Sequence, residues 1–226
     1  MELPGVLILV ITLFGLFAAG VASVVVARRG KTPVARAIAL VGAAWLGAYA
    51  TILIVTSLTS HERTLALGET KRFCGFYLDC HMGVAVERVD TTSAIGGIRA
   101  GGTYYVVTLR VSSNARRRPL RLERPDIVIV DAEGFRHERS LDAEHALGQL
   151  DGLDRLVEAG ASFTRAVVID VPHDVRDPRL EVTMGGVVER TVELALIGDE
   201  DAWLHAPTLH ALVPGSGVSS ASAGLR

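Results

Sequence analysis

Residues 3–27 read LPGVLILVITLFGLFAAGVASVVVA, and residues 37–58 read AIALVGAAWLGAYATILIVTSL. These stretches are 25 and 22 residues long, and neither contains a charged residue. A helix needs about 20 apolar residues to cross the ~30 Å hydrocarbon core of a bilayer. Each stretch therefore predicts a transmembrane helix, and residues 1–58 predict a transmembrane helical hairpin.

The loop between the two helices, residues 28–36, indicates how the hairpin is oriented. It is rich in positive charge: Arg28, Arg29, Lys31 and Arg36. Short loops with an excess of Lys and Arg stay on the cytoplasmic side of a membrane. We therefore expect a protein of the bacterial inner membrane, with both termini and the whole chain after Leu58 on the periplasmic side.

Two other interpretations of the first stretch fit less well. A cleaved signal peptide starts with a basic region and has a shorter apolar stretch, whereas this chain starts Met-Glu-Leu-Pro. A pair of buried helices in a soluble protein keeps a polar face, and neither stretch has one. A retained membrane hairpin is the interpretation we adopt.

The part of the chain outside the hairpin has the composition of a water-soluble domain. With 19 basic and 24 acidic residues it carries a formal charge of −5. This charge argues against a general nucleic-acid binder, whose phosphate contacts need a basic surface. We expect one extracytoplasmic domain at residues 59–198 and a C-terminal extension at residues 199–226.

Short segments rich in β-branched residues follow the hairpin, and turn residues separate them. This pattern predicts an all-β antiparallel sandwich. Gly101-Gly102 is read as one of the turns, and Leu141 to Leu156 is read as a short helical connection despite two internal glycines. The predicted strands are Gly83–Val89, Tyr104–Val111, Ile127–Val130, Phe163–Val171 and Leu180–Met184.

Three stretches of this part of the chain resemble a known family. They are Gly102–Asn114, Val130–Gly134 and Val168–Pro172. Together they are similar to the immunoglobulin-like extracytoplasmic domains of bacterial lipoproteins and membrane-anchored proteins of unassigned function. The resemblance covers roughly residues 66 to 185 and implies an immunoglobulin-like β-sandwich without catalytic residues. The chain departs from the lipoprotein form because it has a two-helix hairpin and no lipidated cysteine.

The two cysteines, Cys74 and Cys80, lie on the expected oxidising side of the membrane, with five residues between them. A small closed loop of this length predicts a structural disulfide. A soft metal such as copper, bound by both thiolates and His81, is the alternative, but no fourth ligand is apparent nearby. The spacing differs from the two intervening residues of a covalent haem site. We expect no metal and no cofactor.

Small residues recur every four positions in both membrane stretches. Such faces let helix backbones approach closely, which is how membrane helices associate. The two faces could meet within the hairpin, or at least one could dock against another membrane protein. The predicted packing residues are Gly15, Ala19 and Ser23 in the first stretch and Ala39, Ala43 and Gly47 in the second, with Ala35 and Thr51 in the same spacing.

Two further groups are candidates for partner contacts. A basic cluster that includes Arg116, Arg117 and Arg118 is either a solvated strand end or a surface for lipid headgroups or an acidic partner. In the C-terminal extension, apolar side chains could anchor the chain to a partner, because such groups dominate interface energetics. These are Trp203, Leu204, Leu209, Leu212 and Val213.

The sequence contains no phosphate-binding loop, nucleophile elbow or zinc-protease motif. We therefore expect a non-catalytic structural subunit that stabilises a larger complex of integral membrane proteins, with an energy-transducing complex, respiratory or photosynthetic, as its host. The alternative is an autonomous envelope module, anchored in the membrane, that binds a ligand or senses the outer environment.

Overall fold

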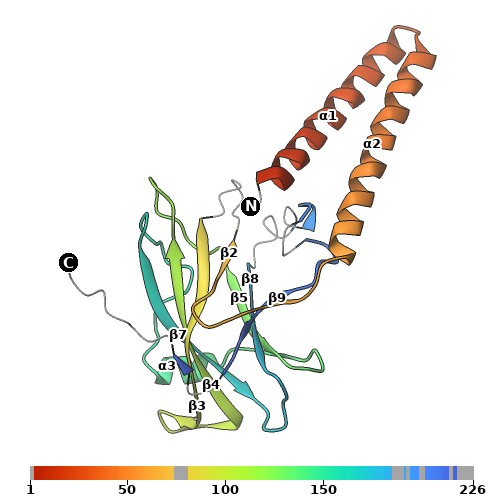
Figure 1. Cartoon of the computed structure of the whole chain (residues 1–226). Helices are drawn as coiled ribbons and strands as arrows, with labels where there is room; N and C mark the ends of the chain where they lie inside the picture. Colours follow the sequence, from red (N-terminus) through yellow and green to blue (C-terminus); the bar gives the residue numbers. More distant parts are fainter. Residues whose placement is uncertain are drawn as a thin grey trace, which may run out of the picture. The chain divides into compact units, whose positions relative to one another are not determined.

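The computed structural model describes residues 3–73, 81–184, 191, 194–198, 202–213 and 216–217. The chain divides into two units. One unit contains residues 1–61 and 190–206, and the other contains residues 62–189 and 207–226. The helical hairpin thus shares a unit with a later segment of the chain, and the β-strands make up the second unit (Figure 1).

The first unit is built on two long helices, α1 (Leu3–Arg28) and α2 (Thr32–Leu58). Gly30, at φ 77°, supplies the left-handed residue of the turn between them, and a proline lies in the first turn of α2, where its missing N–H is tolerated. Both helices are long and apolar enough to cross a membrane. The predicted hairpin is confirmed, with a shorter loop than expected.

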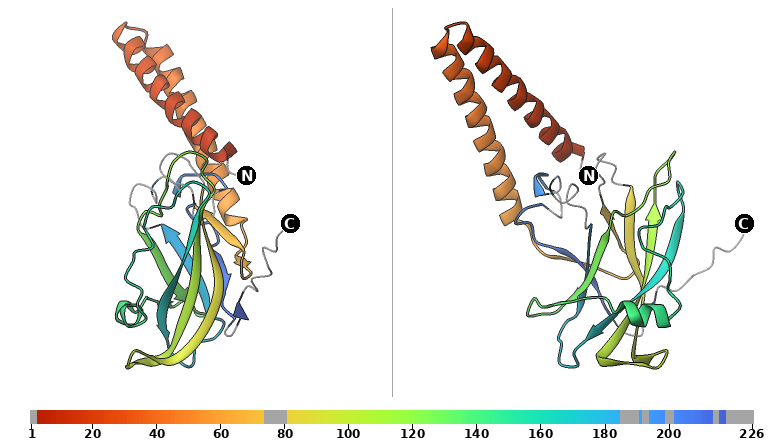
Figure 2. Two further views of the ribbon diagram at one scale, coloured as in Figure 1. Left: turned by 90° about the vertical axis from the view of Figure 1, so that its left-hand side faces the viewer. Right: turned by 180° about the vertical axis from the view of Figure 1, so that it is seen from behind.

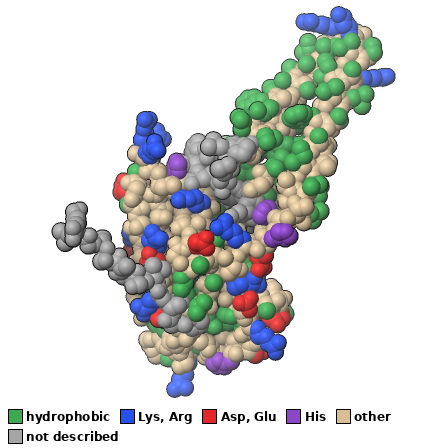
Figure 3. All heavy atoms as spheres, viewed as in Figure 1, with side chains coloured by type: hydrophobic (Ala, Val, Ile, Leu, Met, Phe, Trp, Pro, Cys, Tyr) green, Lys and Arg blue, Asp and Glu red, His purple; other side chains and the backbone are tan. Residues whose placement is uncertain are grey.

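The surface of the hairpin also fits a membrane environment. Hydrophobic side chains cover both helices along their length, and basic side chains gather at the turn (Figure 3). Phe14 and Phe17 are 72% and 73% exposed. A soluble protein rarely exposes so large an apolar surface, whereas lipid would cover it. The two helices therefore fit a membrane anchor.

The second unit is a β-sandwich, as predicted. In the first sheet the strand order is β1-β9-β8-β5-β6, and in the second it is β10-β3-β4-β7, with β2 also paired to β3. All pairings are antiparallel except that of β1 with β9. The bounds are β1 Arg63–Leu65, β2 Thr70–Phe73, β3 Met82–Ile95, β4 Ile98–Ser113, β5 Pro125–Val130, β6 Arg136–His137, β7 Ser162–Val171, β8 Arg179–Met184, β9 Thr208–Ala211 and β10 Ser216–Gly217.

The core of the sandwich comes from the alternation of apolar side chains along its long strands. In β7, Val167 and Ile169 are fully buried between the sheets, and in β4 Val107 and Leu109 are their counterparts. All five strands predicted from the sequence are present. The alternation of apolar and polar residues was sufficient to predict these strands, because each strand has one face in this core.

The β3–β4 hairpin turns at Gly96-Gly97, where φ is 55° and 87°. Two positive φ values in a two-residue loop are typical of a type I′ turn, which glycine adopts most readily. The prediction of a turn at Gly101-Gly102 is wrong, since both lie within β4. Their N–H groups donate to the Asp170 carboxylate at 2.7 and 3.0 Å, and a side chain at Gly102 would collide with the Val171 carbonyl oxygen.

The helix α3 (Leu141–Ala146) lies against the outer face of the second sheet (Figure 2). It is much shorter than the predicted helical connection, because the chain turns at Gly148 with φ 79°. The fully buried Glu144 fixes it to β7 by accepting hydrogen bonds from the Arg165 guanidinium and the Val168 N–H, both at 3.2 Å. Arg139 completes this buried ionic group.

The C-terminal part of the chain differs from the predicted extension at residues 199–226. Residues 202–206 belong to the same unit as the hairpin, and β9 lies inside the first sheet between β1 and β8. Leu212, just after β9, is buried in the core of the sandwich, and Leu209 in β9 is buried beside the β5–β6 turn of the first sheet. The sandwich therefore does not end at residue 198, since it needs a strand from beyond residue 207.

Candidate membrane and partner interfaces

The two membrane helices pack through small and polar side chains. Ser23 Oγ of α1 donates to the Ala35 carbonyl of α2 at 3.0 Å. A Cβ at Gly42 would lie 3.8 Å from the Cβ of Ala19, which is ordinary van der Waals contact. The predicted packing roles of Ala19 and Ser23 agree with this geometry. On α2, however, α1 contacts the face that carries Ala35 and Gly42.

A partly buried hydrogen bond also fixes the rotation of α2 about its own axis. Trp45 Nε1 donates to Thr12 Oγ1 of α1 at 3.2 Å. Thr12 is only 2% exposed, and a hydroxyl in the hydrocarbon region needs such a partner because no water is available there. With Trp45 turned toward α1, the side chains on the opposite side of α2 point away from the hairpin.

That opposite side is the small-residue face of α2, which we define as Ala39, Ala43 and Gly47. All three residues are exposed, and nothing lies within 4 Å of the position that a Cβ at Gly47 would take. Gly15 of α1 is exposed in the same way. These four predicted packing residues are therefore exposed in the described part of the hairpin, and their packing role stays a prediction about a partner.

The small-residue face continues to Thr51 without leaving an unsatisfied polar group. Thr51 Oγ1 donates to the carbonyl of Gly47, one helical turn back, at 2.8 Å. This back-bonding satisfies a hydroxyl inside a membrane helix. The face thus offers a flat surface of small side chains, which suits hydrocarbon chemically and suits another helix at close approach sterically.

The later segment of the first unit packs between the outer ends of the two helices. Tyr49 Oη of α2 donates to the Ala195 carbonyl at 2.5 Å, and Ala202 is buried with Tyr49 and Leu53. At the start of α1, a Cβ on Gly5 would lie 2.5 Å from the Ile197 carbonyl oxygen. Glycine at this position allows the backbones to approach so closely.

The structure divides the predicted C-terminal anchors into two groups. Trp203, Leu204 and Val213 are 53%, 49% and 55% exposed, so they are open to a partner or to lipid. Leu209 and Leu212 are 2% and 7% exposed, and both are buried in the second unit. The prediction of partner contacts at these two leucines is therefore corrected, because both side chains are already covered within the second unit.

The predicted basic cluster lies in the connection between β4 and β5. Arg116, Arg117 and Arg118 are all exposed, and none of them forms an ion pair within the described residues. Nothing in this geometry distinguishes a solvated loop end from a headgroup or partner contact, so the partner role stays a prediction.

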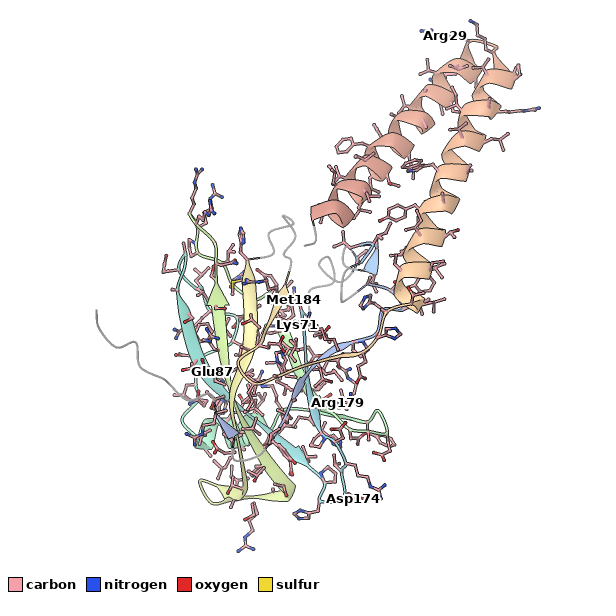
Figure 4. The ribbon with its side chains drawn as sticks, in the orientation of Figure 1. Arg29, Lys71, Glu87, Asp174, Arg179 and Met184 are labelled. Atoms are coloured by element: carbon pink, nitrogen blue, oxygen red, sulfur yellow. The ribbon has the colours of Figure 1, made fainter. Side chains whose placement is uncertain are left out.

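A polar pocket of about 350 Å³ opens on the first sheet, beside the β5–β6 turn. Both of its arginines are already paired with carboxylates of the lining. Arg136 of β6 binds Glu181 of β8, and Arg179 of β8, labelled in Figure 4, binds Glu62. A ligand in this pocket would have to compete with these ion pairs.

Asp131 at the edge of the pocket organises the β5–β6 turn. It accepts hydrogen bonds from the N–H groups of Glu133 and Phe135 at 3.1 and 2.8 Å, and its second oxygen lies 3.1 Å from His137 Nε2. Desolvation raises the pKa of Asp131, but the hydrogen bonds from His137 and the backbone lower it by more. The carboxylate is thus held ionised as a structural acceptor.

The interior of the sandwich contains a second polar group that the sequence did not single out. Lys71 of β2 points between the sheets (Figure 4), and its Nζ donates to the Val182 carbonyl at 3.0 Å. His210 of β9 is fully buried, and neither ring nitrogen has a hydrogen-bond partner. Burial and the nearby Lys71 ammonium lower the pKa of His210 to about 4, although Glu69 opposes them.

Among the described residues, no three His, Cys, Asp or Glu side chains are grouped so as to hold a metal ion. Cys74 and Cys80 lie outside the described residues, so both the predicted disulfide and its copper alternative with His81 stay untested.

No family model matches the chain, and no curated protein sequence matches it. Membership of an immunoglobulin-like family therefore stays a prediction. Three solved structures of bacterial proteins are similar to the chain at low identity. The secreted protein MPT63 from Mycobacterium tuberculosis is 14% identical, with a TM-score of 0.40, over 58% of this chain and 95% of its own.

A conserved hypothetical protein from Bacillus anthracis is 16% identical, with a TM-score of 0.36, over 52% of this chain and 88% of its own. An uncharacterized β-sandwich protein from Clostridium difficile 630 is 7% identical, with a TM-score of 0.38, over 68% of this chain and 96% of its own. These likenesses are too distant to indicate a function.

Proposed function

We propose that this protein is a non-catalytic subunit of a membrane complex. The hairpin anchors it in the bacterial cytoplasmic membrane with the basic turn on the inner side. The small-residue face of α2 docks on a helix of another integral membrane protein. The β-sandwich then contributes to the extracytoplasmic part of the complex.

One observation carries this proposal: the small-residue face of α2 is turned away from α1. Lipid-facing positions of a membrane helix have no need of small side chains, whereas helix–helix contacts are enriched in them because they permit close packing. The neighbouring lipid-facing residues Leu40, Val41 and Leu46 are large and 50% to 70% exposed. A helix that keeps small residues on a second face has room for a second helix there.

The pocket on the first sheet supports the alternative, an autonomous envelope module that binds a small polar ligand. A ligand with one anionic and one cationic group would match the mixed charges of Arg136, Arg179 and Glu181. We place this function second, because every arginine in the pocket already has a carboxylate partner.

Two neighbouring residues of α2 provide a matched test. Ala43→Leu adds bulk to the small-residue face, and Gly42→Leu places the same side chain against Ala19 and Leu16 inside the hairpin. Overpacking at a close helix contact is destabilising. We expect Ala43→Leu to accumulate normally in the membrane and to lose its partner on purification in mild detergent. Gly42→Leu should instead lower the amount of inserted protein.

Val41→Leu, on a large-residue and exposed part of α2, is the control and should change neither property. The proposal fails if the wild-type protein purifies as an isolated monomer or homodimer. It also fails if Ala43→Leu keeps its partner in full stoichiometry.

A further inference from the structure

The return segment, defined as residues 194–198 and 202–206, belongs to the same unit as the membrane hairpin. Tyr49 of α2 binds its backbone at Ala195, and Leu9 of α1 packs against the buried cluster that contains Ala202. The return segment is therefore fixed to the two membrane helices at a definite height along them.

That height can be estimated from the helix rise. Leu9 lies 19 residues before Arg28, and Tyr49 lies 18 residues after Lys31. At 1.5 Å per residue, both are about 27 to 29 Å from the basic turn. The hydrocarbon core is about 30 Å thick, so the return segment meets the helices where hydrocarbon gives way to headgroups on the far side of the membrane.

The outward side chains of the return segment suit that position. Trp203 is 53% exposed, and tryptophan is enriched at membrane–water interfaces because its ring is apolar and its N–H is polar. Leu204 is 49% exposed at φ 64°, a left-handed conformation that disfavours residues with a Cβ. The turn thus holds a leucine outward where glycine would fit with less strain.

Three backbone N–H groups of the return segment also have hydrogen-bond partners within the protein, as a region poor in water requires. Trp203 N–H donates to the Leu194 carbonyl at 3.2 Å, and His205 N–H donates to the Ala202 carbonyl at 3.0 Å. Ala206 N–H donates to Ser60 Oγ at 2.7 Å. Backbone groups near hydrocarbon must find such partners within the protein.

We infer that the return segment is a lipid-contacting element, in which Trp203 and Leu204 enter the headgroup region of the leaflet opposite the basic turn. The occupant of this surface is the bilayer itself, since the return segment is fixed to α1 and α2 at the level of the headgroups. The sequence at residues 199–201 is acidic, so the contact does not require anionic lipid. The inference depends on the hairpin spanning the membrane and is independent of the partner proposed for α2.

The chain has two tryptophans, which makes fluorescence a direct test. In the Trp45→Phe variant, reconstituted at full length in phosphatidylcholine vesicles, all tryptophan emission comes from Trp203. We expect bromine on the acyl chain near the headgroup to quench this emission more strongly than bromine near the terminal methyl. Aqueous acrylamide should quench it weakly.

Trp203→Phe is the matched control, because it leaves Trp45, which lies about 21 Å from the basic turn by helix rise and thus deeper in the bilayer. Its emission should be quenched more by the deeper bromine. If Trp45 responds and Trp203 does not, the inference is overturned while the membrane hairpin stands. If neither tryptophan responds to brominated lipid, the hairpin does not span the bilayer, and the membrane-subunit proposal fails as well.

Leu204→Gly gives an independent measurement, because glycine adopts φ 64° without strain. In the Trp45→Phe background we expect unchanged insertion of the hairpin but reduced quenching of Trp203 by brominated lipid. Equal quenching of Trp203 in the Leu204→Gly variant and in its parent would show that the Leu204 side chain does not contact lipid.

Discussion

His210 is a titratable residue in an environment very different from water. It lies in β9, paired with Leu180 of β8 and Leu65 of β1, and its imidazole is enclosed between the two sheets. A protonated imidazole there would lose its hydration and would face the Lys71 ammonium. The folded sandwich therefore keeps His210 neutral.

This environment predicts a loss of stability in mild acid. The unfolded chain protonates His210 near pH 6.5, and the folded chain only near pH 4, so the unfolded state binds more protons between these values. As pH falls through this window, His210 should remove about 3 kcal/mol from the free energy of unfolding. Thermal unfolding of the detergent-solubilised chain, followed by far-UV circular dichroism, measures the effect.

His210→Leu should flatten this dependence, and it should not lower stability at neutral pH, since the ring nitrogens have no partners to lose. His145→Gln, at an exposed histidine, is the control and should behave as wild type. Equal acid sensitivity in His210→Leu and wild type would show that other groups cause the loss.

At the scale of elements, β9 joins distant parts of the chain. It is the central partner of β1 and β8, and its removal would leave both strands without a neighbour on that side. Burial of a leucine contributes about 1.5 to 3 kcal/mol, and Leu209 and Leu212 would both be lost. Domains are stable by only about 5 to 15 kcal/mol. The sandwich should not survive without this strand.

Two truncations test this dependence. A chain that stops after Val213 keeps β9 and should retain a protease-resistant sandwich. A chain that stops after Ala206 keeps the whole return segment but loses β9, and its sandwich should be digested rapidly. Resistance of the shorter chain equal to that of the longer one would show that residues 207–213 are a dispensable tail, as the sequence suggested.

The elements that the sequence predicted well are those with a local signal. The membrane helices follow from the lack of charge in residues 3–27 and 37–58, and the long strands follow from period-two alternation. β9 has only four residues and follows a proline, so its local signal is that of a loop. It becomes a strand because β1, which lies far away in sequence, offers it a parallel partner.

Spacing alone also could not determine which face of α2 meets α1. Residues four apart advance by about 40° around a helix, so a run of such residues winds from one face to another. Ala35 at one end of the run contacts α1, and Gly47 further along does not. The Trp45–Thr12 hydrogen bond and the fit of Gly42 against Ala19 decide the rotation, and both depend on the pairing of two helices.

For the whole molecule, the prediction that remains is the orientation of the membrane hairpin. All basic residues of the first unit's described helices lie at or near the turn, where Arg29 is labelled in Figure 4. The outer ends of both helices carry none. Because short basic loops are retained on the cytoplasmic side, the turn should be inside and the sandwich outside.

Cysteine labelling in intact cells tests this orientation, in a background where Cys74 and Cys80 are replaced by serine. Thr32→Cys, exposed at the start of α2, should resist a membrane-impermeant thiol reagent until the cells are opened. Asp174→Cys, exposed in the turn between β7 and β8, should react at once. Neither substitution changes the four basic residues that set the orientation. Immediate labelling at residue 32, with protection at residue 174, would place the sandwich in the cytoplasm and would exclude the extracytoplasmic role proposed for it.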